Sequence, residues 1–226
     1  QGETSSIVSC YLEEIGFKSF IVKGLYGQKK SKFSRAHFFP LNFINLNYTY
    51  NEKRELGYIK EVKPEILYKT LHVNIQKSSV TVFLSEILYS VFREELEVNN
   101  NLFNFLFRSL MWYDKIPECN IYHIKFLIEL SKYIGFYPNI INDHDIYFCL
   151  ESGSTTNTKP LGININGVDL KLLKNLLGME FEDLNSMSIS KMSRVRILNY
   201  LIDYYSLHLQ MFKTPKSINV FTQVFK

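Results

Sequence analysis

The hydrophobic pattern of this chain changes near residue 70, and that change constrains the fold more than any other feature. Residues 4–63 hold short runs of β-branched and aromatic residues between Gly, Asn and charged turns, which predicts strands at 5–12, 18–24, 40–50 and 55–63. From about residue 71 apolar residues recur every three or four positions, as in helices. We therefore expect an α+β protein, with a strand domain at 1–69 and a helical domain at 70–226.

The strand segment has the features of a small barrel. Short antiparallel strands joined by one long basic loop, residues 24–37, are typical of the oligonucleotide-binding (OB) β-barrel, the common small barrel that binds nucleic acids. Gly16 suits the turn of the first hairpin, because that turn often needs a positive φ. Only four strands are visible, whereas the OB barrel has five. The chain begins at Gln1 rather than Met, and we expect the fifth strand in preceding sequence.

The helical segment divides into a cluster, an irregular insert and two later helices. Apolar periodicity predicts helices over residues 80–91, over 103–111 after a cap at Asn99–Asn101, and over 121–134 after a cap at Asn120. Residues 139–166 lose this order, so we expect an irregular insert with a short strand at 146–150 and a mobile loop or hairpin. Helices at 168–177 and 190–212 and a tail from residue 213 complete the chain.

Positive charge is concentrated in the strand segment. Residues 1–69 contain 11 Lys and Arg against 7 Asp and Glu, whereas the rest contains 15 of each. No acidic residue occurs between Glu14 and Glu52. A local cationic field follows, which favours a polyanion such as DNA bound with little sequence preference, although such a loop also occurs merely as a solvated surface. The predicted phosphate-binding residues are Lys18, Lys23, Lys29, Lys30, Lys32 and Arg35.

Aromatic residues lie between these cations. Exposed rings stack on bases whatever the sequence, although a small barrel also needs large side chains to fill its interior. We predict that Phe33 and His37 contact DNA and that Phe39 belongs to the core.

Other classes of function find little support in the sequence. The cysteines Cys10, Cys119 and Cys149 form no CxxC pair, so we expect a reducing, cytoplasmic location, no zinc and no cofactor. Asp143-His144-Asp145 contains metal-ligating residue types, but adjacent residues rarely converge on one ion, so we predict no metal site. No run of about 18 apolar residues suggests a membrane span. No nucleophile elbow or phosphate-binding glycine loop occurs, and we predict that the chain is not an enzyme.

An ordered series of short motifs resembles the RecO family of bacterial recombination mediators. The series includes Gly2-Glu3-Thr4-Ser5, Glu14-Ile15-Gly16, Ile21-Val22-Lys23-Gly24, Phe39-Pro40-Leu41, Ser85-Glu86-Ile87-Leu88 and Gly135-Phe136-Tyr137-Pro138. It spans residues 2–138, and its specificity lies in the order rather than in one motif.

The resemblance implies an N-terminal OB barrel and a helical domain without covalent chemistry. It also implies a first barrel strand before the Gly-Glu-Thr motif. Many family members hold structural zinc with four cysteines after the Gly-x-x-Pro segment, whereas this chain has only Cys149 there, which cannot build that site. In the family the helix carrying Lys125 lines a groove for the acidic, Phe-terminated tail of single-stranded-DNA-binding protein. Lys125 is therefore predicted to pair with that tail, unless it is an ordinary exposed lysine.

These features predict a nucleoid-associated protein that binds single- and double-stranded DNA and anneals complementary strands. It is expected to help load recombinase on DNA coated by single-strand-binding protein, together with a RecR-type partner. The alternative is a protein-interaction module whose generic OB fold binds nucleic acid weakly.

Overall fold

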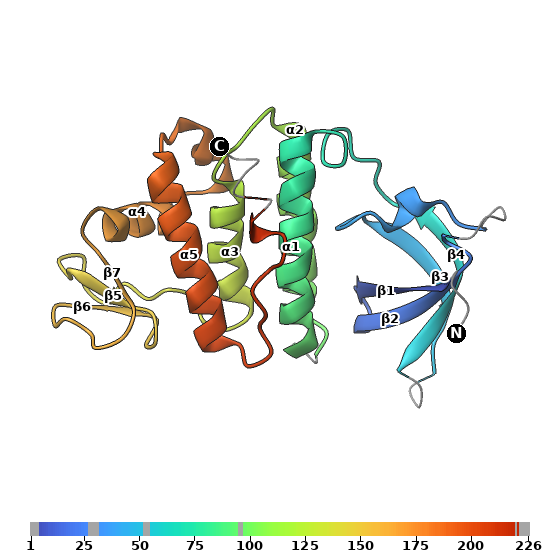
Figure 1. Ribbon diagram of the computed structural model, residues 1–226, viewed down its shortest axis with the longest axis horizontal. Helices are drawn as coiled ribbons and strands as arrows, with labels where there is room; N and C mark the ends of the chain where they lie inside the picture. Colours follow the sequence, from blue (N-terminus) through green and yellow to red (C-terminus); the bar gives the residue numbers. More distant parts are fainter. Residues whose placement is uncertain (1–4, 27–31, 52–54, 95–96, 220, 222–226) are drawn as a thin grey trace.

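The computed structural model describes residues 5–26, 32–51, 55–94, 97–219 and 221, and it contains a strand domain beside a helical domain (Figure 1). The strand domain comprises β1 (Ser5–Leu12), β2 (Gly16–Lys23), the 3-10 helix η1 (Arg35–Phe38), β3 (Ile44–Thr49) and β4 (Leu56–Pro64). The helical domain comprises α1 (Ile75–Glu94), α2 (Asn100–Lys115), α3 (Tyr122–Tyr133), β5 (Tyr147–Cys149), β6 (Ser154–Thr156), β7 (Asn164–Asn166), α4 (Gly167–Leu177), the 3-10 helix η2 (Phe181–Ser186) and α5 (Lys191–His208). The predicted α+β fold is confirmed.

The four strands of the first domain form one curled sheet in the order β1-β2-β4-β3. The turn between β1 and β2 uses Gly16 at φ +68°, as expected. The inward-facing side chains enclose a small core of Phe20, Val22, Leu25, Ile59 and Val62. Phe20 of β2 reaches Tyr48 of β3 across the intervening β4, with ring centroids 5.2 Å apart. The sheet therefore curls around Phe20.

Gly57 makes this close approach sterically feasible. A Cβ atom at this position would lie 2.8 Å from the Phe20 ring and 2.9 Å from the carbonyl oxygen of Thr49. Those distances are far shorter than ordinary van der Waals contact, so a side chain would force the curled sheet apart.

The edges of the sheet border a large cleft. β1 and β3 are the two outer strands, and the described residues place no further strand between them. A cleft of about 710 Å³ lies between these edges and helices α1 and α2. Its apolar lining includes Val8, Cys10 and Leu12 from β1 and Ile44, Leu46 and Tyr48 from β3. The closed five-stranded barrel stays a prediction, because its fifth strand was expected in sequence before Gln1.

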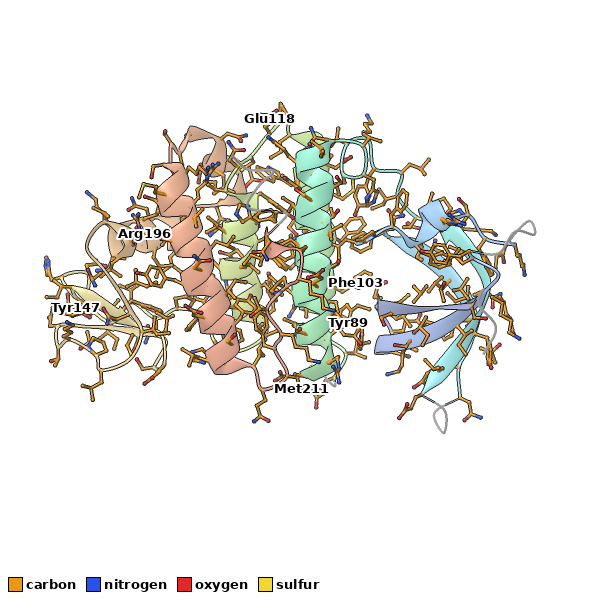
Figure 2. All side chains as sticks on the ribbon, viewed as in Figure 1. Tyr89, Phe103, Glu118, Tyr147, Arg196 and Met211 are labelled. Atoms are coloured by element: carbon orange, nitrogen blue, oxygen red, sulfur yellow. The ribbon has the colours of Figure 1, made fainter. Side chains whose placement is uncertain are left out.

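Uncharged aromatic rings join the strand domain to the helical domain. Tyr11 stacks on Phe92 of α1 with ring centroids 4.1 Å apart, and Phe17 meets Tyr89 edge to face at 5.7 Å. Phe43 meets Phe103 of α2 at 5.7 Å. Figure 2 shows Tyr89 and Phe103 on the side of the helices that faces the strand domain. Such pairs each add about 0.5–1.5 kcal/mol beyond the burial of their area, so this contact fixes the domains against one another.

The connector between the two domains is held by the carboxylate of Asp114, at the end of α2. It accepts backbone N–H bonds from Lys69 at 2.9 Å, Thr70 at 2.7 Å and Leu71 at 3.0 Å. Burial raises the pKa of Asp114, but these hydrogen bonds outweigh burial and hold the pKa below its usual value. Lys77, only 2% exposed, donates to the hydroxyl of Thr70 at 2.7 Å and the carbonyl of Ile116 at 2.6 Å. The connector is therefore a fixed part of the helical domain.

The helical domain has one continuous apolar core, to which α1, α2, α3, α4 and α5 all contribute. The predicted Asn99 cap is confirmed, since its side chain accepts the N–H of Leu102 at 2.9 Å. The predicted cap at Asn120 is wrong. Ile121 is the residue before α3, and no side chain caps this helix, because Asn120 lies within the preceding turn. The last helix ends at His208 rather than at residue 212, since Leu209 is already extended.

The insert is more ordered than predicted. Instead of one strand and a mobile loop or hairpin, it forms a three-stranded antiparallel sheet in the order β6-β5-β7. Its core-facing residues Phe148, Thr155 and Ile165 are buried, and burial of that face explains the order. The backbone carbonyls of Asp143 and Asp145 accept hydrogen bonds from Lys174. Within the described residues no three His, Cys, Asp or Glu side chains are grouped to hold a metal ion.

The tail after α5 runs back along α1. The backbone N–H groups of Gln210 and Met211 donate to the carboxylate of Glu94, and that of Ser217 donates to Glu86 at 3.2 Å. Phe221, 2% exposed, then stacks on Phe83 of α1 at 4.7 Å. It also meets His123 of α3 edge to face at 4.6 Å. Burial lowers the pKa of His123 to about 3, with a contribution from the positive charge of Arg194.

Among the described helices none is both long enough and apolar enough to cross a membrane.

Candidate nucleic-acid interface

The residues after β2 position Arg35. Leu25 is 5% exposed and anchors the turn in the core, which leaves the next residue, Tyr26, 63% exposed. Ser34 caps η1 by accepting the N–H of Ala36 at 3.3 Å, so Arg35 begins this short helix. The Nε of Arg35 donates to the carbonyl of Leu25 at 3.0 Å, and its guanidinium lies 4.7 Å from the centroid of the Tyr26 ring. The geometry presents a cation and an aromatic ring together.

Strand β4 carries a second such pair on its outer face. In the register of the sheet Ile21 of β2 lies beside Tyr58 of β4, and Lys23 follows Ile21 by two residues on the same face. The Nζ of Lys23 lies 5.8 Å from the centroid of the Tyr58 ring. Lys32 donates to the backbone carbonyl of Lys60, an exposed residue of β4 at the bulge where the pairing with β3 shifts between Ile59 and Glu61. We call Lys23, Lys32, Arg35 and Lys60 the cationic cluster.

The cationic cluster retains its positive charge. The ion pairs among the described residues are Lys63–Glu61, Lys125–Glu129 and Arg196–Asp169, and none includes a member of the cluster. Lys23, Lys32, Arg35 and Lys60 are all exposed. Four unneutralised, solvated cations on neighbouring elements create a local field that attracts polyanions.

Lys18 lies apart from the cluster. It precedes Lys23 by five residues on β2, a distance of about 17 Å, and an odd spacing points the two side chains to opposite faces. Its Nζ lies 5.6 Å from the ring of Tyr50 instead. Lys18 therefore does not join the surface that carries Lys23. Lys29 and Lys30, also predicted to bind phosphates, lie outside the described residues.

The aromatic residues with predicted roles, Phe33, His37 and Phe39, differ in their exposure. Phe33 is half-buried against the core of the strand domain and meets Phe38 edge to face, with ring centroids 6.2 Å apart. His37 is also half-buried, and its Nδ1 is enclosed. The prediction that Phe39 belongs to the core is wrong, because Phe39 is 46% exposed and its ring lies against the connector residue His72, with ring centroids 5.4 Å apart. The sharp turn after η1, where Leu41 has φ +60°, directs it outward.

Tyr26, Tyr58 and Lys60 were missed in the sequence. Alternation at the start of β4 was the available signal: Gly57 and Ile59 are buried and Tyr58 between them is exposed, but the alternation breaks at the bulge, where Lys60 and Glu61 are both exposed. This pattern indicated an exposed aromatic residue at Tyr58. Tyr26 follows a buried leucine in a turn, and no periodicity could have placed it.

Lys125 lies in the interior of the helical domain. It is 1% exposed, its Nζ is 2.6 Å from the carboxylate of Glu129, and it donates to the carbonyl of Leu176 at the end of α4 at 3.0 Å. It is thus not the ordinary exposed lysine of the alternative interpretation. The predicted pairing with a partner's carboxylate needs an accessible ammonium. In this conformation the ammonium is buried, and Glu129 already forms the ion pair that the partner's carboxylate would form.

Comparisons with known proteins match nearly the whole chain. The family model described as Recombination protein O N terminal matches residues 1–67, and the model described as Recombination protein O C terminal matches residues 72–217. The DNA repair protein RecO of Flavobacterium psychrophilum is 34% identical over 223 residues, covering 99% of this chain and 93% of that protein. Those of Flavobacterium johnsoniae and Christiangramia forsetii are 34% and 31% identical, at the same coverage. The chain therefore belongs to the RecO family.

Proposed function

We propose that this chain is a non-enzymatic recombination mediator that acts on DNA in repair. It binds single- and double-stranded DNA through the strand domain, anneals complementary strands, and helps load recombinase on DNA coated by single-strand-binding protein. The observation that carries the proposal is the cationic cluster, four exposed side chains of the strand domain that form no ion pair with any other described residue. The names of the relatives, DNA repair protein RecO, support the same assignment.

The proposed DNA-binding and partner-binding parts of the chain meet at the connector. The strand domain, residues 1–69, binds DNA, and the helical domain, residues 70–226, contacts protein partners of two kinds. These are a RecR-type partner and the acidic tail of single-stranded-DNA-binding protein. If Lys125 takes part, its ion pair with Glu129 must first open, which predicts that the tail binds more tightly when Glu129 is replaced by Gln.

Salt dependence of DNA binding tests the role of the cluster. Each phosphate neutralised on a single strand contributes about −0.7 to the slope of log K against log salt. Replacing Lys23, Lys32 and Arg35 together by Gln should therefore flatten the slope by about 2 and weaken binding at low salt. Gln keeps a long polar side chain, so the surface is otherwise conserved. A second variant, with Lys29 and Lys30 replaced by Gln, separates the loop from the cluster.

A matched control carries the same change of charge elsewhere. Lys159, Lys171 and Lys191 are exposed on the helical domain, and their joint replacement by Gln should leave the slope unchanged. Unchanged binding by the cluster variant, or equal loss in the control, would reject the cluster as the DNA site. Failure of the unmodified chain to bind DNA at low salt would instead favour the protein-interaction module. A labelled acidic peptide ending in Phe, titrated in parallel, measures that second activity.

A further inference from the structure

The outer face of the strand domain carries an apolar row that the cationic cluster alone does not explain. Ile7 of β1 pairs with Ile21 of β2, and Ile21 pairs with Tyr58 of β4, so these side chains form one row across three strands. The row lies on the face opposite to the core residues, because its members alternate with Val8, Phe20, Val22 and Ile59. Ile7 is 65% exposed and Tyr58 is 42% exposed. A solvated sheet face does not need such side chains.

Two exposed tyrosines in this region each lie beside a cation of the cluster. Lys23 accompanies Tyr58, and Arg35 accompanies Tyr26 at 4.7 Å. The Arg35 guanidinium is fixed by its bond to the carbonyl of Leu25, and Lys32 is fixed by its bond to the carbonyl of Lys60. Arg35 is thus held beside Tyr26, which lowers the entropy lost on binding.

We infer that Tyr26 and Tyr58 stack on the bases of a single strand and make this face prefer unpaired DNA over duplex. An aromatic ring stacks on any exposed base, and a neighbouring cation contacts the phosphate of the same nucleotide. In a duplex the base faces are already stacked on one another, so the rings gain nothing and only the phosphate contacts remain. The inference rests on the proposed function, since it assigns the strand preference of the same site.

Charge complementarity decides which occupant fits the apolar row. A protein partner for Ile7, Ile21 and Tyr58 would have to approach beside Lys23, which forms no ion pair among the described residues, at a cost in desolvation unless it were acidic. A nucleic-acid strand supplies both the flat apolar surface of its bases and the negative charge of its backbone. A single strand therefore satisfies the rings and the cations together.

The test compares single-stranded and duplex DNA with the full chain. Tyr26 and Tyr58 are replaced by Leu, singly and together, and binding to a labelled oligodeoxythymidine and to a blunt duplex of the same length is measured by fluorescence anisotropy. Leu keeps an apolar side chain but removes the ring. Each single replacement should weaken single-strand binding about tenfold and duplex binding less than about twofold. Replacement by Phe, which retains the ring, should restore single-strand binding.

Tyr147 provides the control, because it lies on β5 in the helical domain, at the far end of the molecule from the strand domain (Figure 2). Tyr147→Leu should leave both affinities unchanged. Unchanged single-strand binding by the Tyr26 and Tyr58 variants, or equal loss on both DNAs, overturns the inference while the proposed function stands. If the unmodified chain binds neither DNA at low salt, both are overturned.

Discussion

Replacing Asp114 by Asn tests whether one carboxylate fixes the connector between the domains. Its Oδ1 accepts the N–H groups of Thr70 and Leu71, and its Oδ2 accepts the N–H of Lys69. Asn has the same shape but only one acceptor oxygen. If that oxygen takes the Oδ1 position, the amide nitrogen faces the N–H of Lys69, two donors meet, and one hydrogen bond is lost.

The expected loss of stability follows from the number and kind of bonds. Hydrogen bonds to a charged group contribute about 1.5–3 kcal/mol each, against about 0.5–1.5 kcal/mol for neutral pairs. Asp114→Asn loses the bond to Lys69 and converts the others from charged to neutral, and it also removes the negative charge near the buried ammonium of Lys77. We expect the free energy of unfolding to fall by about 3 kcal/mol, which lowers the midpoint temperature by about 6–12 °C.

Urea unfolding, followed by the fluorescence of Trp112, measures this change. Trp112 is the single tryptophan of the chain and lies on α2, two residues before Asp114, in contact with Phe181 at 5.5 Å. The control is Asp203→Asn on the exposed face of α5, which should change stability by less than about 0.5 kcal/mol. A loss as small as the control's in Asp114→Asn would refute the role of this carboxylate.

The pH dependence gives an independent check, because the pKa of Asp114 is lower in the folded chain than its ordinary value of 3.8. The native state therefore binds fewer protons here than the unfolded state, and the stabilisation is complete above the ordinary pKa. This stabilisation is lost as the pH falls through the pKa that Asp114 has in the folded chain. The stability difference between the unmodified chain and Asp114→Asn should accordingly narrow below about pH 4, and a difference that stays constant would contradict the argument.

Three further changes test the packing within the helical domain and within the strand domain. Phe221→Ala should lower the free energy of unfolding by about 3–4 kcal/mol in urea, since it empties a fully enclosed ring site. The neutral, buried His123 should make stability fall by up to about 1.4 kcal/mol per unit as the pH drops from 6.5 towards 3, a slope that His123→Leu should reduce. Gly57→Ala should cost about 1–3 kcal/mol by thermal unfolding, whereas Gly178→Ala, with ordinary 3.8 Å contacts, should not.

Local periodicity was sufficient to predict most of the fold. The first strand was predicted at its observed bounds, 5–12, because its side chains alternate and its turn uses glycine at Gly16. The helices around the main core followed from apolar spacing alone. The insert at 139–166 was underestimated, since its strands are only three residues long and gain their order from packing on α4 and α5, which no local pattern records.

The positive charge of the candidate site could be predicted from the sequence, but the relative positions of its side chains could not. An acid-free segment of sequence indicates a positive surface, yet whether two cations share a face depends on strand register. Lys18 and Lys23 are five residues apart on one strand and point oppositely, whereas Lys32 and Lys60, 28 residues apart, touch. Lys125 shows the opposite case, a charged residue whose burial could not be predicted from the sequence. From the sequence alone a lysine beside Phe126 resembles a surface residue, but in the structure it is buried and the carbonyl of Leu176 at the end of α4 accepts a hydrogen bond from it.

The direction of β2 explains how the proposed mediator could bind DNA and protein at the same time. Phe17, near the start of β2, contacts the helical domain, and Lys23, six residues later, lies about 20 Å away at the other end of the strand. The interdomain contact uses uncharged rings, so a polyanion gains nothing by competing for it. We therefore propose that DNA held at Lys23 lies at the end of β2 away from α1, and that the remaining surface of the helical domain stays available to a partner while the strand is held.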